Sequence, residues 1–176
     1  MKRVQTRKPF IYYEALKQWE IITIVIYALI TLVIALSSFV FDIETRQNSV
    51  IGYAIVTQLS FLFFLYVSLR NFAFYLMCLG FGFMHFILFL CFKGSPELQM
   101  EGNPSGLLAN TLPLLFLFQI LRYLSVKKQQ REFVSPAKGS EGDLIENKKP
   151  TVADYIISII YMGVWFGLTM FSVSFS

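Results

Sequence analysis

Five long apolar runs constrain the fold of this chain more than any other feature of its sequence. One helical crossing of a bilayer takes about 20 apolar residues, and the runs cover residues 21–41, 50–69, 72–92, 107–124 and 155–175. Only 15% of the residues are charged, whereas about 25% is usual in soluble domains. We therefore expect an all-α integral membrane protein, a single domain over residues 1–176 built as a bundle of five transmembrane helices.

The segments between the runs are polar. Residues 42–49 predict a turn, and residues 93–106 predict a loop because Gly and Pro recur there. Arg70 and Asn71 separate the second run from the third, which predicts a tight helical hairpin with Arg70 at the membrane surface. Residues 126–154 carry dense charge without apolar periodicity, so we expect a cytoplasmic loop that is solvated or ordered by a partner.

The fourth run is the weakest of the five as a crossing. It is short, contains Asn110, Thr111, Pro113 and Gln119, and ends on Arg122. Pro113 lacks a backbone donor, which predicts a kink within residues 109–113. The segment is either a full crossing or a re-entrant one.

The last helix has a recognisable start. Pro150 precedes Thr151, and Asp154 follows three residues later. A hydroxyl and a carboxylate at this spacing can accept hydrogen bonds from the amides of a first helical turn. We therefore expect this helix to begin near Thr151.

The basic residues predict the orientation, because cytoplasmic loops carry the excess of Lys and Arg. Five crossings place only Arg46 and Lys93 on one side, and thirteen of the fifteen Lys and Arg residues on the other: Lys2, Arg3, Arg7, Lys8, Lys17, Arg70, Arg122, Lys127, Lys128, Arg131, Lys138, Lys148 and Lys149. We expect a bacterial cytoplasmic membrane protein with its N-terminus inside and its C-terminus outside. The net charge of +4 reflects this asymmetry, and we expect no direct contact with nucleic acid.

Residues 9–20 mix aromatic and charged side chains ahead of the first run. Aromatic rings favour the headgroup layer, so this segment predicts an interfacial helix on the inner leaflet with Trp19 as a lipid contact. The helix is either an anchoring collar or a membrane sensor.

His85 lies in the middle of the third run and is the chain's single histidine. A histidine at this depth either makes a structural hydrogen bond between helices or lines a pore or switch. The polar residues Asn110, Pro113 and Gln119 of the fourth run are candidates for the same pore or switch. Metal and haem sites need further ligands, and we expect no cofactor.

Chemistry-bearing motifs are missing from the sequence. It contains no nucleophile elbow, zinc-protease motif or phosphate loop, and no carboxylate lies in the middle of a predicted crossing. We therefore expect no enzyme. Ion-driven transporters usually carry ionisable groups within the membrane, so driven transport is also disfavoured.

Small and polar residues recur at helical spacing in three of the runs and predict helix-packing faces. They are Thr23, Tyr27 and Thr31 in the first run, Tyr53, Thr57 and Ser60 in the second, and the pair Gly163 and Gly167 in the last. Each face packs either within the chain or in an oligomer.

The loop after the fourth run predicts contacts with lipid and protein. Lys127, Lys128 and Arg131 would attract anionic headgroups of the inner leaflet. Phe133 lies among the charged residues that follow, and such a loop could bind a cytoplasmic protein partner.

We expect a non-enzymatic multispanning subunit, a homo-oligomer or part of a membrane complex, that acts as a sensor or scaffold between the bilayer and a cytoplasmic partner. A small homo-oligomeric channel and an accessory subunit of a larger complex are the alternatives. In size and layout the chain resembles small multispanning sensors of bacterial antiphage systems, of which the Kiwa type is one. This resemblance implies a role in antiphage defence.

Overall fold

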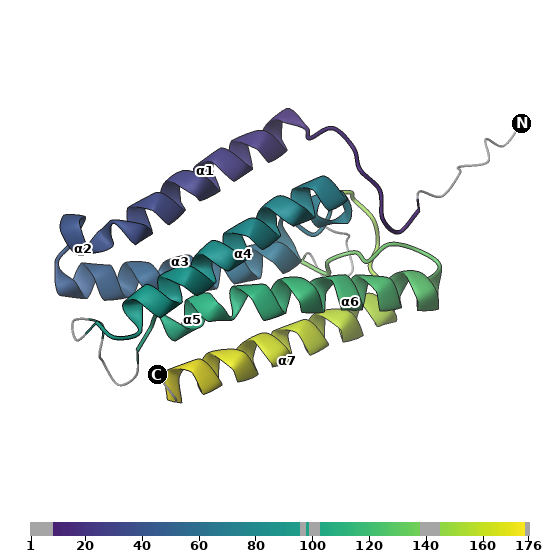
Figure 1. The fold of residues 1–176 in the computed structure, drawn as a ribbon. Helices are drawn as coiled ribbons and strands as arrows, with labels where there is room; N and C mark the ends of the chain where they lie inside the picture. Colours follow the sequence, from purple (N-terminus) through teal and green to yellow (C-terminus); the bar gives the residue numbers. More distant parts are fainter. Residues whose placement is uncertain (1–8, 96–97, 99–102, 138–144, 175–176) are drawn as a thin grey trace, which may run out of the picture.

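The computed structural model describes residues 9–95, 98, 103–137 and 145–174, and its regular elements are helical. The long helices lie side by side and alternate in direction (Figure 1). They are α1 (Gln18–Ala35), α3 (Ile43–Phe63), α4 (Phe72–Phe92), α6 (Thr111–Gln129) and α7 (Val152–Ser174). The all-α expectation is confirmed for the described residues.

The short elements divide between the two ends of the bundle (Figure 1). The helices α2 (Ser37–Val40) and α5 (Gly106–Ala109) lie at the end where the chain terminates. The 3₁₀ turn η1 (Ser68–Arg70), residues 9–17 and the connection between α6 and α7 gather at the opposite end. We call the described parts of that connection, residues 130–137 and 145–151, the strap.

Within the described residues, four helical segments are long and apolar enough to cross a membrane. They are α1, α4, the consecutive helices α5 and α6, and α7. Helix α3 is 21 residues long, but its first two turns are polar. The chain is therefore compatible with a multispanning membrane protein, and the fifth crossing stays a prediction.

The polar turn predicted for residues 42–49 is wrong, because helix α3 already begins at Ile43. Asp42 caps this helix, with its Oδ2 accepting a hydrogen bond of 3.1 Å from the Thr45 amide. The hydrogen bonds from Thr45 lower the pKa of Asp42 below its ordinary value. A capped first turn explains how a polar stretch forms helix here.

The tight hairpin predicted around Arg70 is also wrong. Helix α3 ends at Phe63, and eight residues that include η1 separate it from α4. Arg70 is 6% exposed. It is buried against the strap rather than exposed in a turn.

Residues 9–17 do not form the predicted interfacial helix. They cross the end of the bundle as a non-helical segment whose backbone is bonded to the start of α4. The carbonyl oxygen of Tyr12 accepts from the Phe72 amide at 2.9 Å. Glu14 and Asn71 pair through the Glu14 backbone, with distances of 3.2 and 2.9 Å. These bonds replace the ones a helix would have supplied.

Three boundaries agree with the sequence. Helix α4 covers the third run, residues 72–92. The helix of the fourth run is interrupted at Asn110, between α5 and α6, within the predicted kink. The Thr151 amide donates to Asp154 Oδ2 at 2.8 Å, and the Asp154 amide lies 3.4 Å from Thr151 Oγ1, as the capping pattern predicts.

Two apolar clusters form the interior. The larger lies between α3, α4, α6 and α7 near the strap, and the smaller joins α1, α3, α4 and α5 towards the other end. Large apolar side chains also cover the outward faces of α1, α4 and α7. Such faces suit a hydrocarbon surrounding.

Candidate functional site

Two buried guanidinium groups lie where the strap crosses the end of the bundle. Arg122, near the end of α6, is 2% exposed, and Arg70 comes from η1. A buried charge is stable only when it is paired and hydrogen-bonded. The contacts of these two residues define the site.

Arg122 binds Glu132 of the strap through two parallel bonds. Its Nε lies 2.8 Å from Glu132 Oε2, and its Nη2 lies 2.8 Å from Oε1. Nη2 also donates to the carbonyl oxygen of Phe10 at 2.9 Å, and the guanidinium covers the Phe10 ring at 4.4 Å. A forked pair of this kind fixes both distance and orientation. Arg122 therefore joins α6, the strap and residues 9–17.

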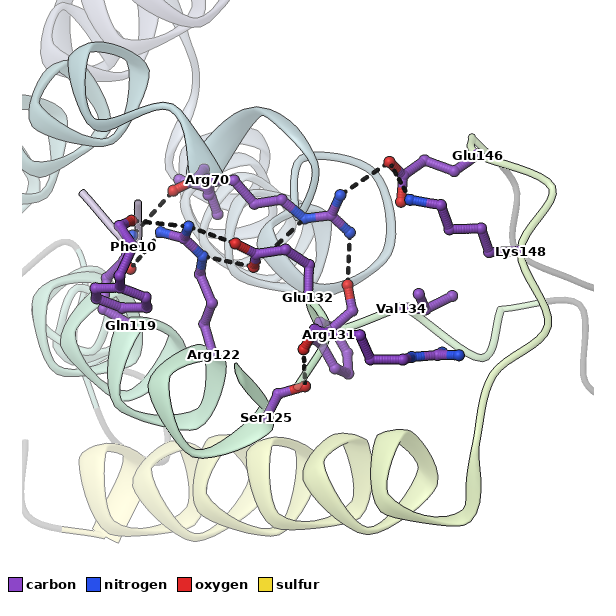
Figure 2. A network of polar contacts seen from close by, with 12 residues as sticks. Phe10, Arg70, Gln119, Arg122, Ser125, Arg131, Glu132, Val134, Glu146 and Lys148 are labelled. Carbon is purple, nitrogen blue, oxygen red and sulfur yellow. Dashed lines mark hydrogen bonds and ion pairs between the residues drawn. The ribbon is translucent and has the colours of Figure 1, made fainter. Parts of the chain in front are cut away.

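Arg70 binds both described parts of the strap. Its Nη2 donates to the carbonyl oxygen of Phe133 at 2.6 Å, and its Nη1 lies 2.9 Å from Glu146 Oε1. Its Nε is 3.9 Å from Glu132 Oε2. Figure 2 shows the Arg70 and Arg122 guanidiniums reaching Glu132 from two sides. We call these four charged residues, Arg70, Arg122, Glu132 and Glu146, the latch.

Asp154, which is fully buried in the first turn of α7, holds the other side of the strap. Its Oδ2 lies 2.6 Å from Arg131 Nη2, and its Oδ1 accepts from the Val134 amide at 3.3 Å and from Gln129 Nε2 at 3.1 Å. A carboxylate is also favoured at a helix N-terminus. The strap is thus fixed to α7 as well as to α6 and η1.

The strap carries apolar groups into the core. Phe133 is 2% exposed, and its ring makes edge contacts with Tyr66 and Phe118 at centroid distances of 5.9 and 6.3 Å. Val134 beside it is buried too. Phe133 was expected to contact lipid or a partner, whereas the structure places it inside the chain, because its carbonyl and ring both have partners there.

His85 is the centre of a second polar cluster, in the middle of the bundle. Its Nε2 lies 2.8 Å from the Tyr53 hydroxyl and 3.4 Å from that of Tyr27, and its Nδ1 lies 2.9 Å from Thr111 Oγ1. The Tyr53 hydroxyl is also 2.5 Å from Thr31 Oγ1. Both ring nitrogens therefore have partners within one chain, as expected of a structural histidine.

The hydrogen bonds continue from Thr111 to α7. Gln58 of α3 donates to Thr111 Oγ1 at 3.4 Å and to the Leu107 carbonyl oxygen at 2.6 Å. Trp165 Nε1 donates to Gln58 Oε1 at 3.0 Å, and the Tyr161 hydroxyl donates to the Gln58 carbonyl oxygen at 2.9 Å. A single connected network thus touches α1, α3, α4, α6 and α7.

The other pore or switch candidates do not gather around His85. Asn110 is buried and accepts from Ser172 of α7 at 3.0 Å. Gln119 donates to the Leu69 carbonyl oxygen at 2.9 Å and lies beside Arg122. Pro113 faces outward. The side chains of Asn110 and Gln119 therefore make contacts within the chain.

The predicted packing residues divide into three groups by burial. Tyr53, Thr57 and Thr31 are buried between helices, whereas Thr23 and Ser60 are partly buried and donate to carbonyl oxygens of their own helices. Tyr27 is partly buried against Phe81 and Tyr53. Gly163 and Gly167 are exposed on α7, with open space where a Cβ would lie.

The predicted lipid contacts lie near the strap end. Trp19, Lys127 and Lys128 are exposed at the start of α1 and the end of α6. Arg131 is partly covered and bound to Asp154. Thirteen basic residues were predicted on one side of the membrane. Eight of them belong to the strap end. The other five lie outside the described residues: Lys2, Arg3, Arg7, Lys8 and Lys138.

Sequence reasoning missed the two acids of the latch and the role of Gln58. Glu132 and Glu146 lie in a segment that shows no periodicity, so their partners could not be inferred. A sequence signal was available for Arg70 and Arg122, since each interrupts or ends an apolar run and a charge there needs a partner. In the part of the chain that the structure describes, no three His, Cys, Asp or Glu side chains are placed to hold a metal ion.

The geometry defines a helical bundle with an internally bonded strap at one end. Comparison of the chain with protein-family models, with curated proteins and with solved structures finds no match.

Proposed function

We propose that the protein is a non-enzymatic, multispanning membrane subunit whose five long helices cross the bilayer with the strap on the cytoplasmic side. In this role the strap reports the arrangement of the helices to a cytoplasmic partner. The positive-inside distribution supports the orientation, because eight described basic residues belong to the strap end, while Arg46 and Lys93 belong to the other.

The latch is the observation that carries this proposal. Arg122 comes from helix α6 and Arg70 from η1, between α3 and α4, yet both bind Glu132. Removing one member of a buried pair costs about 3–5 kcal/mol, and somewhat less where the partner is partly exposed, as Glu132 is. A shift between η1 and α6 therefore cannot occur without changing how the strap is held.

The hydrogen-bonded network around His85 supports the same role. It connects all five long helices, so a displacement of one helix is resisted by its neighbours. Contiguous polar networks of this kind can carry coupling when the elements have two arrangements. A bundle joined in this way can transmit a change in bilayer thickness to the strap.

The test measures strap mobility in bilayers of different thickness. A spin label on Lys149→Cys, in a chain with Cys78→Ala and Cys91→Ala, is reconstituted in short-chain and long-chain lipids. We expect its mobility to differ between the two bilayers while the latch is intact. With Glu132→Gln we expect high mobility in both, because the neutral amide cannot hold two guanidiniums.

Glu44→Gln is the matched control, since Glu44 is an exposed acid in the first turn of α3, at the opposite end of the bundle. It should behave as the parent. Equal label mobility in thin and thick bilayers with the latch intact would contradict the coupling, as would a Glu132→Gln variant that behaves as Glu44→Gln does.

An oligomer is part of the proposal. The uncovered Gly163 and Gly167 face of α7 lets a second helix approach closely, and a monomeric mass by native mass spectrometry in mild detergent would remove this part. The channel, the accessory subunit and the antiphage role remain hypotheses without a specific observation in their favour.

A further inference from the structure

A cavity of about 890 Å³ lies between the start of α1 and the strap. Residues from 12 to 20 form one wall, the strap forms the other, and Arg70 and Asn71 belong to the lining between them. The latch closes this end of the bundle on one side of the cavity. Three latch residues, Arg70, Glu132 and Glu146, belong to its lining, whereas the wall formed by residues 12–20 has no part in the coupling described above.

The charges of the two walls differ in sign. The wall before and at the start of α1 carries two acids and one base: Glu14, Glu20 and Lys17. The strap and η1 carry three bases and two acids: Arg70, Arg131, Lys148, Glu132 and Glu146. The cavity is neutral in total, with a surplus of negative charge on one wall and of positive charge on the other. This arrangement suits a zwitterion better than a polyanion.

Part of the lining is apolar. Ala15, Val67, Val126 and Val134 face the same cavity as the charged groups. The cavity also adjoins the first turn of α1, where the exposed ring of Trp19 lies. Exposed Trp rings favour the headgroup layer of a bilayer. A ligand with a charged head and an apolar body matches this position.

Arg131 offers a donor on the positive wall. Its Nη2 is committed to Asp154, but its Nε is buried and has no hydrogen-bond partner among the described residues. A buried donor without a partner costs about 1–3 kcal/mol. A phosphate oxygen in the cavity would face the Arg131 guanidinium and the Lys148 ammonium, which lies 3.0 Å from Glu146 Oε1 on the same wall.

We propose that this cavity binds the headgroup of a zwitterionic phospholipid with a primary ammonium. The phosphate lies towards Arg131 and Lys148, the ammonium lies towards Glu14 and Glu20, and the acyl chains leave along the apolar surface of the bundle. The site rests on the proposed placement of the strap end at the membrane surface, and it does not require a cytoplasmic partner.

The experiment titrates defined lipids onto the full chain in mild detergent and counts bound lipid by native mass spectrometry. The probes are phosphatidylethanolamine, phosphatidylcholine, phosphatidylglycerol and free phosphoethanolamine. We expect phosphatidylethanolamine to bind about tenfold more tightly than phosphatidylcholine, because only its ammonium donates charge-assisted hydrogen bonds to the carboxylates.

Two variants locate the site. Lys148→Gln removes a positive group from the cavity together with its ion pair to Glu146 of the latch. Ala15→Trp fills the cavity from an exposed position, without changing charge and without touching the latch. Each should weaken phosphatidylethanolamine binding severalfold. Lys128→Gln is the matched control, because it removes the same charge from an exposed side chain outside the cavity lining, and it should leave binding unchanged.

Equal binding of phosphatidylglycerol would overturn the preference for a zwitterion. If free phosphoethanolamine bound as tightly as phosphatidylethanolamine, the proposal that the ligand is a lipid would be refuted. Parent-like binding by both Lys148→Gln and Ala15→Trp would overturn the location. Strap mobility in the Ala15→Trp variant separates this proposal from the coupling. If the variant loses lipid binding while its strap mobility still differs between thin and thick bilayers, the lipid site and the coupling are independent. If the parent binds no lipid but keeps the coupling, the lipid site alone is refuted.

Discussion

At the scale of single residues, His85 shows how a polar side chain is accommodated deep in an apolar helix. It has no exposed surface, and its two ring nitrogens have partners on different helices, Tyr53 on one side and Thr111 on the other. A buried polar group that is fully hydrogen-bonded stabilises one arrangement of its neighbours against others. His85 is therefore a residue that specifies how the helices fit together.

Tyr53→Phe tests this role. The change removes a hydroxyl that lies 2.5 Å from Thr31 Oγ1 and 2.8 Å from His85 Nε2, so we expect a loss of about 1–3 kcal/mol in the free energy of unfolding. Thermal unfolding in mild detergent measures it. Tyr123→Phe, at an exposed ring, is the control, and equal stability of the two variants would show that the network adds nothing.

For His85 the sequence left a structural hydrogen bond and a pore or switch role as alternatives, and it did not identify the partners. A lone histidine inside an apolar run must be satisfied by other helices, and this is a local argument. Gln58 was not identified, because its partners Tyr161 and Trp165 are more than one hundred residues away. The burial of Arg70 was not predicted, because the acids that pair with it lie in a segment without periodicity.

At the scale of helices, Gly82 sets the approach of α4 to α6. A Cβ built at Gly82 would lie 2.9 Å from Leu112 Cδ2 and 3.3 Å from Leu115 Cδ1. Contacts this short require the leucine side chains to move. The small residue therefore permits close packing of the two helices, as it does in membrane bundles generally.

Gly82→Ala is expected to be about 1–3 kcal/mol less stable than Gly80→Ala, because the added methyl group overpacks the contact while both variants gain the same helix propensity. Gly80→Ala is the matched control on the same helix, where a Cβ meets open space. It should leave stability unchanged or raise it by up to about 1 kcal/mol through helix propensity. Thermal unfolding of both variants gives the comparison, and a Gly82→Ala protein as stable as Gly80→Ala would refute the packing role.

The bounds of a helix could be predicted from the sequence where the helix coincides with an apolar run. Helix α4 has flanking breaks and no polar ends, so its bounds were predicted. Helix α3 begins earlier than its apolar run, because the Asp42 cap allows polar residues into its first turns. Residues 9–17 show why composition was insufficient: bonds to the bundle satisfy their backbone, and these bonds cannot be read from aromatic and charged residues alone.

At the scale of the whole molecule, the two ends of the bundle differ in chemistry. The strap end holds eight described basic residues, the latch and the charged cavity, while Arg46 and Lys93 belong to the other end. This polarity is the basis for placing the strap inside the cell. The placement also requires α3 to cross the bilayer, although its first turns are polar.

Cysteine labelling from the two sides of the membrane tests this placement most directly. The two variants, Thr45→Cys and Lys149→Cys, are made in the background lacking Cys78 and Cys91. Both positions are exposed, and three predicted crossings separate them. In spheroplasts treated with a membrane-impermeant maleimide, we predict that position 45 reacts at once. Position 149 should react only after the membrane is opened. Labelling of both positions from the same side would contradict the account, because α3 would then not cross.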